Sequence, residues 1–238
     1  MRVLIIIPAY NEEANITRVV RTVTDFAAGY TRHQVDYVVI NDGSTDATGE
    51  ICRRNGFETV HLVQNLGIGG AVQTGYLLAQ QLGYDAAVQF DGDGQHDIAS
   101  LDALLRPIEE GRANFVIGSR YLEHTSAFRS TFMRRLGSSF LALTLRIFSG
   151  FRPTDPTSGY RAADRAGIGV LARDYPADYP EPESIVILLK HKLRVTEVGV
   201  NMFERTGGVS SISPLKSVRY MIKVSLAILC SSFQRREK

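Results

Sequence analysis

Two aspartates separated by one glycine carry the clearest chemistry in this sequence. Asp91 and Asp93 flank Gly92 after a short apolar run, and the glycine permits a turn in which both carboxylates approach one cation or one sugar hydroxyl. Gln95 offers a third oxygen. Oxygen ligands without a His or Cys cluster favour Mg²⁺ or Mn²⁺ over zinc, and such a cation completes its shell with substrate phosphates and water.

The same Asp-Gly-Asp-Gly run has two other interpretations. One is a surface turn, because turns favour these residue types, and the residues alone leave it open. The other is a calcium loop of the EF-hand kind, which needs a carboxylate about twelve positions from the first ligand. Asp102 aside, the register does not fit that loop.

Two further turn-rich segments precede helical patterns. In the first, Asp42 either belongs to a simple turn or accepts a hydrogen bond from a nucleobase, with Ser44 or Thr45 as a possible helix cap. In the second, the glycines from Gly67 to Gly70 let the backbone come close to a ligand or a neighbouring strand. Both segments are therefore candidate parts of a ligand site.

Three residues in the middle of the chain could bind a phosphate. Arg120 closes an apolar run, and Arg134 and Ser138 lie one helical turn apart, so both reach one side of a helix. Arginine fits phosphate oxygens with two parallel hydrogen bonds. The alternative is that Arg134 belongs to a solvated helix face.

These candidates follow the strands of an expected α/β fold. Short apolar runs alternate with helical patterns through the first half, which predicts a mostly parallel sheet with helices on both faces. The acidic loops follow the first, second and fourth strands, so they should meet at the carboxyl edge of the sheet. The expected strands are 3–7, 37–40, 59–63, 86–90 and 115–117, and the expected helices are 15–28, 46–54 and 69–82.

The second half departs from this alternation. We expect a helix over 131–149, a turn at Asp155-Pro156 and a Pro-rich turn over 179–183. Residues 1–213 are expected to form one domain. Residues 214–238 are expected to form an amphipathic C-terminal helix, packed in the core or lying on a membrane or a partner. The residues expected on its apolar side are Val218, Met221, Ile222, Ser225, Leu226 and Leu229.

The composition restricts the function. With 238 residues and 44% hydrophobic side chains the chain can bury one large core, and its formal charge of +2 does not indicate nucleic-acid binding. No signal peptide is expected, and no run reaches the roughly 20 apolar residues that span a bilayer. Cys52 and Cys230 are expected as buried free thiols, which suits a reducing cytosol.

An ordered set of motifs resembles the inverting family 2 glycosyltransferases of GT-A fold, and within them the dolichyl- and polyprenyl-phosphate sugar synthases. The resemblance covers about residue 3 to about residue 213. The motifs are Ile7-Pro8-Ala9-Tyr10-Asn11-Glu12, Asn41-Asp42-Gly43-Ser44-Thr45-Asp46, Asn65-Leu66-Gly67, Asp91-Gly92-Asp93 and Ser158-Gly159-Tyr160-Arg161.

The resemblance implies a nucleotide-sugar donor, a polyprenyl-phosphate acceptor and a divalent metal, Mg²⁺ or Mn²⁺. It implies metal ligation by Asp91, Asp93 and Gln95, and acceptor-phosphate binding by Arg120, Arg134, Ser138 and Arg205. Arg205 also begins a glycine-containing loop over the diphosphate, and Asp93 and Arg205 are expected to act in catalysis. The implied nucleotide site comprises Pro8, Ala9, Tyr10, Glu12, Asp42, Gly67, Gly70, Asp91 and Gly92.

Two carboxylates compete for the role of catalytic base. Asp155 matches the family's candidate base, and Glu183 falls where relatives with hydroxyl acceptors place theirs. A phosphate acceptor is largely a dianion at neutral pH because its second pKa is near 6, so we expect Asp155 to orient a substrate.

The expected activity is therefore transfer of a hexose or N-acetylhexosamine, from a UDP-sugar rather than a GDP-sugar, to a polyprenyl phosphate at the cytoplasmic face of a membrane. One alternative is the same fold acting on a saccharide hydroxyl in cell-surface polysaccharide synthesis. Another is an inactive nucleotide-binding module. A nicotinamide dehydrogenase is disfavoured because the third glycine of its fingerprint would fall at Val72. A homo-oligomer or a small membrane-protein partner also fits the sequence.

Overall fold

The computed structural model describes residues 1–122, 132–203 and 223–230, with the backbone alone for 132–136. Within these residues a seven-stranded sheet has the order β3-β2-β1-β4-β6-β5-β7, and β6 is antiparallel to its two neighbours. The strands are β1 (Arg2–Ala9), β2 (Gln34–Asn41), β3 (Thr59–His61), β4 (Ala86–Gln89), β5 (Phe115–Ser119), β6 (Arg161–Asp164) and β7 (Val195–Gly199).

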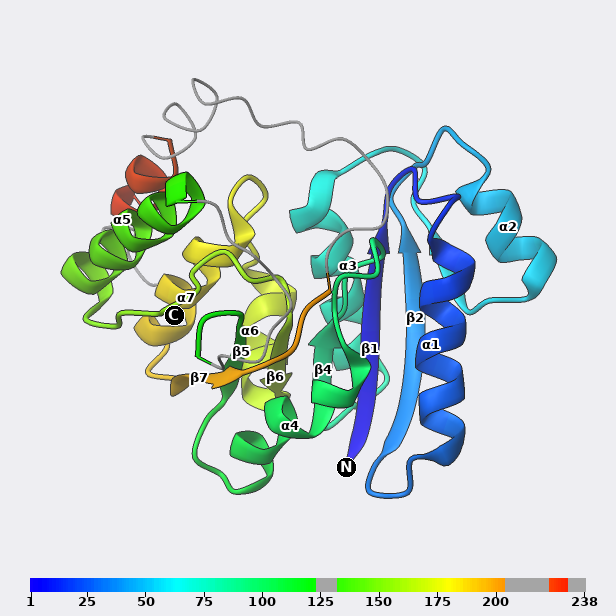
Figure 1. The fold of residues 1–238 in the computed structure, drawn as a ribbon, viewed down its shortest axis with the longest axis horizontal. Coiled ribbons are helices and arrows are strands. Elements are labelled where there is room, and N and C mark those ends of the chain that lie inside the picture. Colours follow the sequence, from blue (N-terminus) through cyan, green and yellow to red (C-terminus); the bar gives the residue numbers. More distant parts are fainter. Residues whose placement is uncertain (123–131, 204–222, 231–238) are drawn as a thin grey trace.

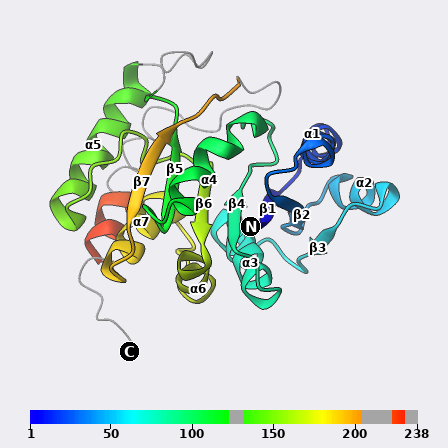
Figure 2. The same ribbon diagram turned by 90° about the horizontal axis from the view of Figure 1, so that it is seen from below.

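Helices cover both faces of this sheet (Figure 1). Viewed nearly along the strands, α1 and α4 lie on one side of the row of strands and α3, α6 and α7 on the other (Figure 2). The helices are α1 (Ile16–Gly29), α2 (Thr48–Asn55), α3 (Gly67–Gln81), α4 (Leu101–Glu109), α5 (Phe132–Ser149), α6 (Arg165–Arg173) and α7 (Pro180–Lys190), with a short 3₁₀ turn η1 at Ile98–Ser100.

The inner strand β1 divides its side chains between two hydrophobic cores. Leu4 and Ile6 join the core that contains α3, whereas Val3, Ile5 and Ile7 join the core that contains α1 and α4. This alternation fixes the register of β1, because a shift of one residue would exchange the two faces. The carboxyl end of β1 is thereby held at the edge of the sheet where the acidic loops emerge.

The mostly parallel sheet is confirmed, and the five expected strands are present with shifted ends. The Pro-rich turn expected over 179–183 is wrong, because α7 begins at Pro180 and Pro182 lies in its first turn. Proline is accepted there since the first helical N–H groups have no partner within the helix. The strands β6 and β7 and the helices α4 and α6 were not expected.

Most of the expected C-terminal helix lies outside the described residues, but 223–230 are helical. Val224 and Ile228 are buried in the core that contains α3, whereas Leu226 is exposed, so the apolar side expected for this stretch is wrong. Cys52 is buried as expected and Cys230 is exposed, contrary to expectation. The division of the chain at residue 213 stays a prediction.

Among the described residues, no helix combines the length and the apolar character that crossing a bilayer requires.

Candidate active site

Three loops meet at the carboxyl edge of the sheet, after β1, β2 and β4. The N–H of Asp42 donates to Ala9 O at 2.9 Å, and the N–H of Gly92 donates to Pro8 O at 3.3 Å. A Cβ at Gly92 would stand 2.8 Å from Pro8 O, so this close approach of two backbones requires glycine. The loops expected to converge from strand order alone are thus joined through their backbones.

Side chains connect the first loop to the second. Asn11, with a φ of 55°, accepts from Thr45 N through Oδ1 at 2.9 Å, and its own N–H donates to Ser44 Oγ at 3.1 Å. Glu12 N donates to Thr48 Oγ1 at 2.9 Å. The expectation that Ser44 or Thr45 caps the following helix is therefore wrong: both bind Asn11, and α2 begins at Thr48 without a side-chain cap.

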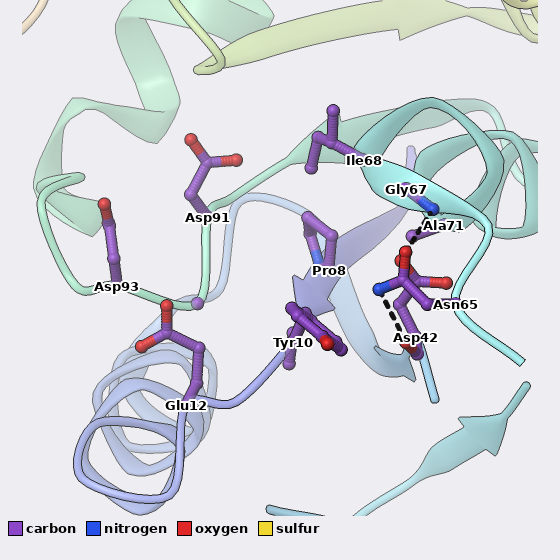
Figure 3. Close-up of a pocket in the computed structure, with 12 residues that line it drawn as sticks. Pro8, Tyr10, Glu12, Asp42, Asn65, Gly67, Ile68, Ala71, Asp91 and Asp93 are labelled. Atoms are coloured by element: carbon purple, nitrogen blue, oxygen red, sulfur yellow. Dashed lines mark hydrogen bonds between the residues drawn. The ribbon is translucent and has the colours of Figure 1, made fainter. Parts of the chain in front are cut away.

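A pocket of about 360 Å³ opens between these loops and the start of α3, within the size range of small-molecule sites. It is lined by every residue of the expected nucleotide site except Gly70. Asp93 lines it too. In Figure 3 the carboxylates of Asp91, Asp93 and Glu12 occupy one end of the pocket, and Asp42 occupies the other. The lining residues are Pro8, Ala9, Tyr10, Glu12, Asp42, Asn65, Gly67, Ile68, Ala71, Asp91, Gly92 and Asp93.

Asp42 is held rigidly at its end of the pocket. Its Oδ1 accepts from Leu66 N at 2.7 Å, and its backbone oxygen accepts from Asn65 Nδ2 at 3.1 Å. Asn65 Oδ1 in turn accepts from Gly67 N at 3.1 Å. Asn65 was assigned no role from the sequence, although it opens one of the quoted motifs. It fixes the loop that orients Asp42.

Asp91 and Asp93 are held in orientation by their neighbours at the other end. Asp91 Oδ1 accepts from Gln89 Nε2 at 3.0 Å, and Asp93 Oδ1 accepts from Gln95 N at 3.0 Å. In Figure 3 both side chains point to the same side of their loop. Gln95 contributes its backbone here, and its side chain is not among the pocket-lining groups.

This donor set fits a hard divalent cation that shares its shell with a ligand. Asp91 and Asp93 supply anionic oxygen donors, which suit Mg²⁺ or Mn²⁺. Across 1–122, 132–203 and 223–230, no group of three His, Cys, Asp or Glu side chains is arranged to hold a metal. A cation at this pair would need further oxygens from a ligand or water, as expected for a diphosphate complex.

His96 supports the loop that carries these two aspartates through a hydrogen bond to its backbone. Asp91 N donates to His96 Nδ1 at 3.1 Å, which places the ring proton on Nε2, 3.5 Å from Asp91 Oδ2. The ring stacks on Tyr160 with centroids 4.6 Å apart. Burial lowers the pKa of His96 although Asp91 and Asp93 act to raise it, so the ring is neutral near pH 7. This contact was not predicted from the sequence.

Arg120 and Asp155 form a buried ion pair beside this loop. Arg120 donates from Nε to Oδ2 at 2.6 Å and from Nη2 to Oδ1 at 2.7 Å, and Asp155 is fully buried. Burial lowers the pKa of the Arg120 guanidinium, but Asp155 outweighs it and holds that pKa above its ordinary value. The segment that carries Asp155 also approaches the acidic loop closely, since a Cβ at Gly159 would stand 2.5 Å from Asp91 Oδ2. The sequence singled out both residues but not their pairing.

Ser138 and Glu183, two other residues expected in the site, are not among the residues that line the pocket. Ser138 lies on the buried side of α5, and its Oγ has no hydrogen-bond partner among the described residues. Glu183 lies in the first turn of α7 and does not line the pocket. The side chain of Arg134 and the whole of Arg205 lie outside the described residues.

Comparison with known proteins identifies what this arrangement resembles. The sequence model described as Glycosyl transferase family 2 matches residues 4–168. The UDP-N-acetylglucosamine–dolichyl-phosphate N-acetylglucosaminyltransferase of Methanococcus voltae is 31% identical, over 83% of this chain and 84% of its own length. The polyprenol monophosphomannose synthase of Mycolicibacterium smegmatis is also 31% identical, over 94% of this chain and 86% of its own length.

A solved structure has the same fold. Glucosyl-3-phosphoglycerate synthase from Mycobacterium tuberculosis, in complex with Mn²⁺, UDP and glucosyl-3-phosphoglycerate, superposes with a TM-score of 0.71 at 22% identity. The match covers 100% of this chain and 81% of that one. The expected GT-A fold is thereby confirmed.

The contacts of His96 predict its effect on stability. In His96→Phe the ring still packs on Tyr160, but the N–H of Asp91 loses its acceptor, which should lower the free energy of unfolding by about 1–3 kcal/mol. His191→Phe, at an exposed histidine that caps α7, should change it by less than about 0.5 kcal/mol. Urea denaturation measures both. Equal stability of the two variants would contradict the role assigned to His96.

Proposed function

The chain belongs to glycosyl transferase family 2, and on that premise we propose that it transfers a sugar from a nucleotide sugar to a polyprenyl phosphate, with inversion at the anomeric carbon. Two relatives named for lipid-phosphate acceptors, each covered over more than four fifths of its length, support this acceptor. The observation that carries the proposal is the close approach of the segment that holds Asp155, the partner of Arg120, to the Asp91–Asp93 pair at the pocket: a Cβ at Gly159 would stand 2.5 Å from Asp91 Oδ2.

The donor nucleotide is proposed to occupy the pocket, with its base toward Asp42 and its diphosphate toward Asp91 and Asp93. Asp42 is a fixed acceptor for a base N–H, because a backbone amide already holds its carboxylate in place. Asp91 and Asp93 would hold Mg²⁺ or Mn²⁺ together with the diphosphate oxygens. When bound, such a cation offsets the negative charge that develops on the departing nucleoside diphosphate.

The acceptor phosphate is proposed to bind on the Arg120 side. One of its oxygens attacks the anomeric carbon from the face opposite the diphosphate, so a new carbon–oxygen bond forms as the bond to the diphosphate breaks. No proton has to be removed, because the acceptor phosphate is largely a dianion at neutral pH. A buried Asp155, with both oxygens held by Arg120, suits an orienting role better than that of a base.

Three other residues complete the proposed acceptor site. Ser138 offers a buried hydroxyl, and Arg134 lies one helical turn before it on α5. Arg205 is proposed to bind the acceptor phosphate and the donor diphosphate, and this proposal rests on its sequence motif alone. Glu183 would act as a base only if the acceptor were a hydroxyl group.

We also propose that α5 lies against the membrane surface that carries the acceptor. Phe140, Leu143 and Ile147 form an outward apolar stripe, with exposures of 47%, 48% and 67%. Arg146, exposed beside this stripe, complements anionic lipid headgroups. The same helix carries Ser138 on its buried side, so attachment of α5 would bring the acceptor site to the lipid phosphate.

An extraction assay tests the proposed reaction. The protein is incubated with Mn²⁺, undecaprenyl phosphate and a panel of radiolabelled UDP- and GDP-sugars, and the label in an organic-solvent extract is counted. Wild type should transfer label from at least one donor. Arg120→Lys should raise the KM for the lipid phosphate about tenfold, because lysine cannot hold Asp155 with two parallel hydrogen bonds and also present a guanidinium N–H to the phosphate.

The matched control is Arg165→Lys, because Arg165 pairs with Asp85 just before β4, at the end of that strand opposite the acidic loop, and should leave KM unchanged. Label that reaches only a water-soluble saccharide would contradict the proposed acceptor. Tight nucleotide binding without transfer from any donor would indicate the inactive binding module.

Vesicle binding tests the membrane surface. The double variant Leu143→Glu/Ile147→Glu should lower the fraction bound to anionic vesicles at least about tenfold, because it removes apolar contact and adds charge repulsion. The control is Leu77→Glu/Leu82→Glu, two leucines that are each 49% exposed on or next to α3. Sedimentation with phosphatidylglycerol vesicles measures both. Equal losses in the two variants, or no binding by wild type, would contradict the assignment of α5.

A further inference from the structure

The segment that carries Asp155 is held by a residue from a distant strand. Glu197, on the edge strand β7, accepts from Thr154 N through Oε2 at 2.6 Å and from Asp155 N through Oε1 at 3.0 Å. The hydroxyl of Thr154 adds a third contact to Oε1 at 3.3 Å. One carboxylate thus holds two consecutive backbone amides just before the ion pair.

The other end of the same segment is held by a buried cation. Arg161, which is 1% exposed, donates from Nη2 to Pro156 O at 3.2 Å and from Nε to Ser158 O at 2.5 Å. Its Nη1 also reaches Glu181 O in the first turn of α7 at 2.6 Å. The carboxylate of Glu197 therefore binds the N–H groups of Thr154 and Asp155. The guanidinium of Arg161 binds the carbonyl groups of Pro156 and Ser158.

These two anchors leave Asp155 little freedom, and Asp155 in turn determines where Arg120 points. Besides the two side-chain contacts of the ion pair, Arg120 N donates to Asp155 Oδ2 at 3.2 Å. Arg120 Nη2 also donates to Thr157 Oγ1 at 3.1 Å, on the same segment. A displacement of residues 154–157 would therefore displace the guanidinium.

We propose that Glu197 is a positioning residue for the acceptor phosphate: by holding the amides of Thr154 and Asp155, it sets the orientation in which Arg120 meets that phosphate. This inference rests on the proposed function, because it takes the Arg120 side as the acceptor side. Glu197 itself acts through Asp155 and touches no substrate.

The chemistry of the contact requires a carboxylate rather than an amide. Both oxygens of Glu197 accept N–H groups, whereas glutamine has one oxygen and one NH₂. In Glu197→Gln that NH₂ would face the N–H of either Thr154 or Asp155, so one of the two anchors becomes a contact between donors. Burial raises the pKa of Glu197, and the two amides act to lower it, which agrees with a partly desolvated carboxylate held by N–H donors.

Steady-state kinetics on the intact protein test this role. Glu197→Gln is expected to raise the KM for undecaprenyl phosphate about tenfold, while the Kd of the donor nucleotide stays within about twofold of wild type. Asp85→Asn is the matched control, because Asp85 also accepts a backbone N–H, from Arg2 at 2.7 Å, but lies just before β4, at the end of that strand opposite the acidic loop. It should change neither constant, and thermal unfolding of both variants shows whether the protein remains folded.

A double variant separates action through Arg120 from an independent effect. If Glu197 acts by orienting the guanidinium, Glu197→Gln should raise KM by less than about twofold in a protein that already carries Arg120→Lys, because residues that act as one unit are not additive. A full tenfold increase in that background would overturn the inference. Donor Kd and acceptor KM rising together would also overturn it, because that result indicates general damage to the site.

The single variants distinguish failure of this inference from failure of the proposed function. If Arg120→Lys raises the acceptor KM and Glu197→Gln does not, the role of Glu197 is wrong and the acceptor site stands. If neither variant changes the acceptor KM, the acceptor site itself is wrong, and the role of Glu197 is lost with it.

Discussion

The repulsion between carboxylates gathered at one edge of the sheet is the constraint on which the site depends. Asp91 and Asp93 lie in one loop, and the fold keeps both directed at the pocket through contacts from Gln89, His96 and the backbone of Gln95. Two like charges held in this way favour a bound cation, since an opposite charge stabilises both ionised forms. The hydrogen bonds among the loops maintain this arrangement.

The positive charge of the site comes from Arg120, which is paired with Asp155. The side chain of Arg120 is 12% exposed, and its charge is matched by the fully buried Asp155, so the pair adds no net charge to the site. Supports from β7 and β6, through Glu197 and Arg161, hold the segment between them in place. A preorganised cation beside a preorganised anion pair is suited to bring an anionic acceptor to a donor diphosphate without rearrangement during the reaction.

The sequence predicted the half of this site that depends on local order and missed the half that depends on distant contacts. The loops after β1, β2 and β4 followed from alternating strands and helices, because parallel strands must end at one edge. The antiparallel β6 and the helix start at Pro180 were missed, since a four-residue strand and a proline-rich turn carry no distinctive periodicity. The pairing of Arg120 with Asp155, and the support from Glu197, span 35 to 43 residues and are visible only in three dimensions.

Binding of Mn²⁺ followed by its electron paramagnetic resonance signal tests the central claim most directly. The account predicts that wild-type protein removes the free Mn²⁺ signal strongly only when UDP or GDP is present, because the aspartate pair and the diphosphate share the coordination shell. The double variant Asp91→Asn/Asp93→Asn should leave the signal at the level given by the nucleotide alone. Equal nucleotide affinity with and without a chelator, together with normal Mn²⁺ uptake by the double variant, would contradict it.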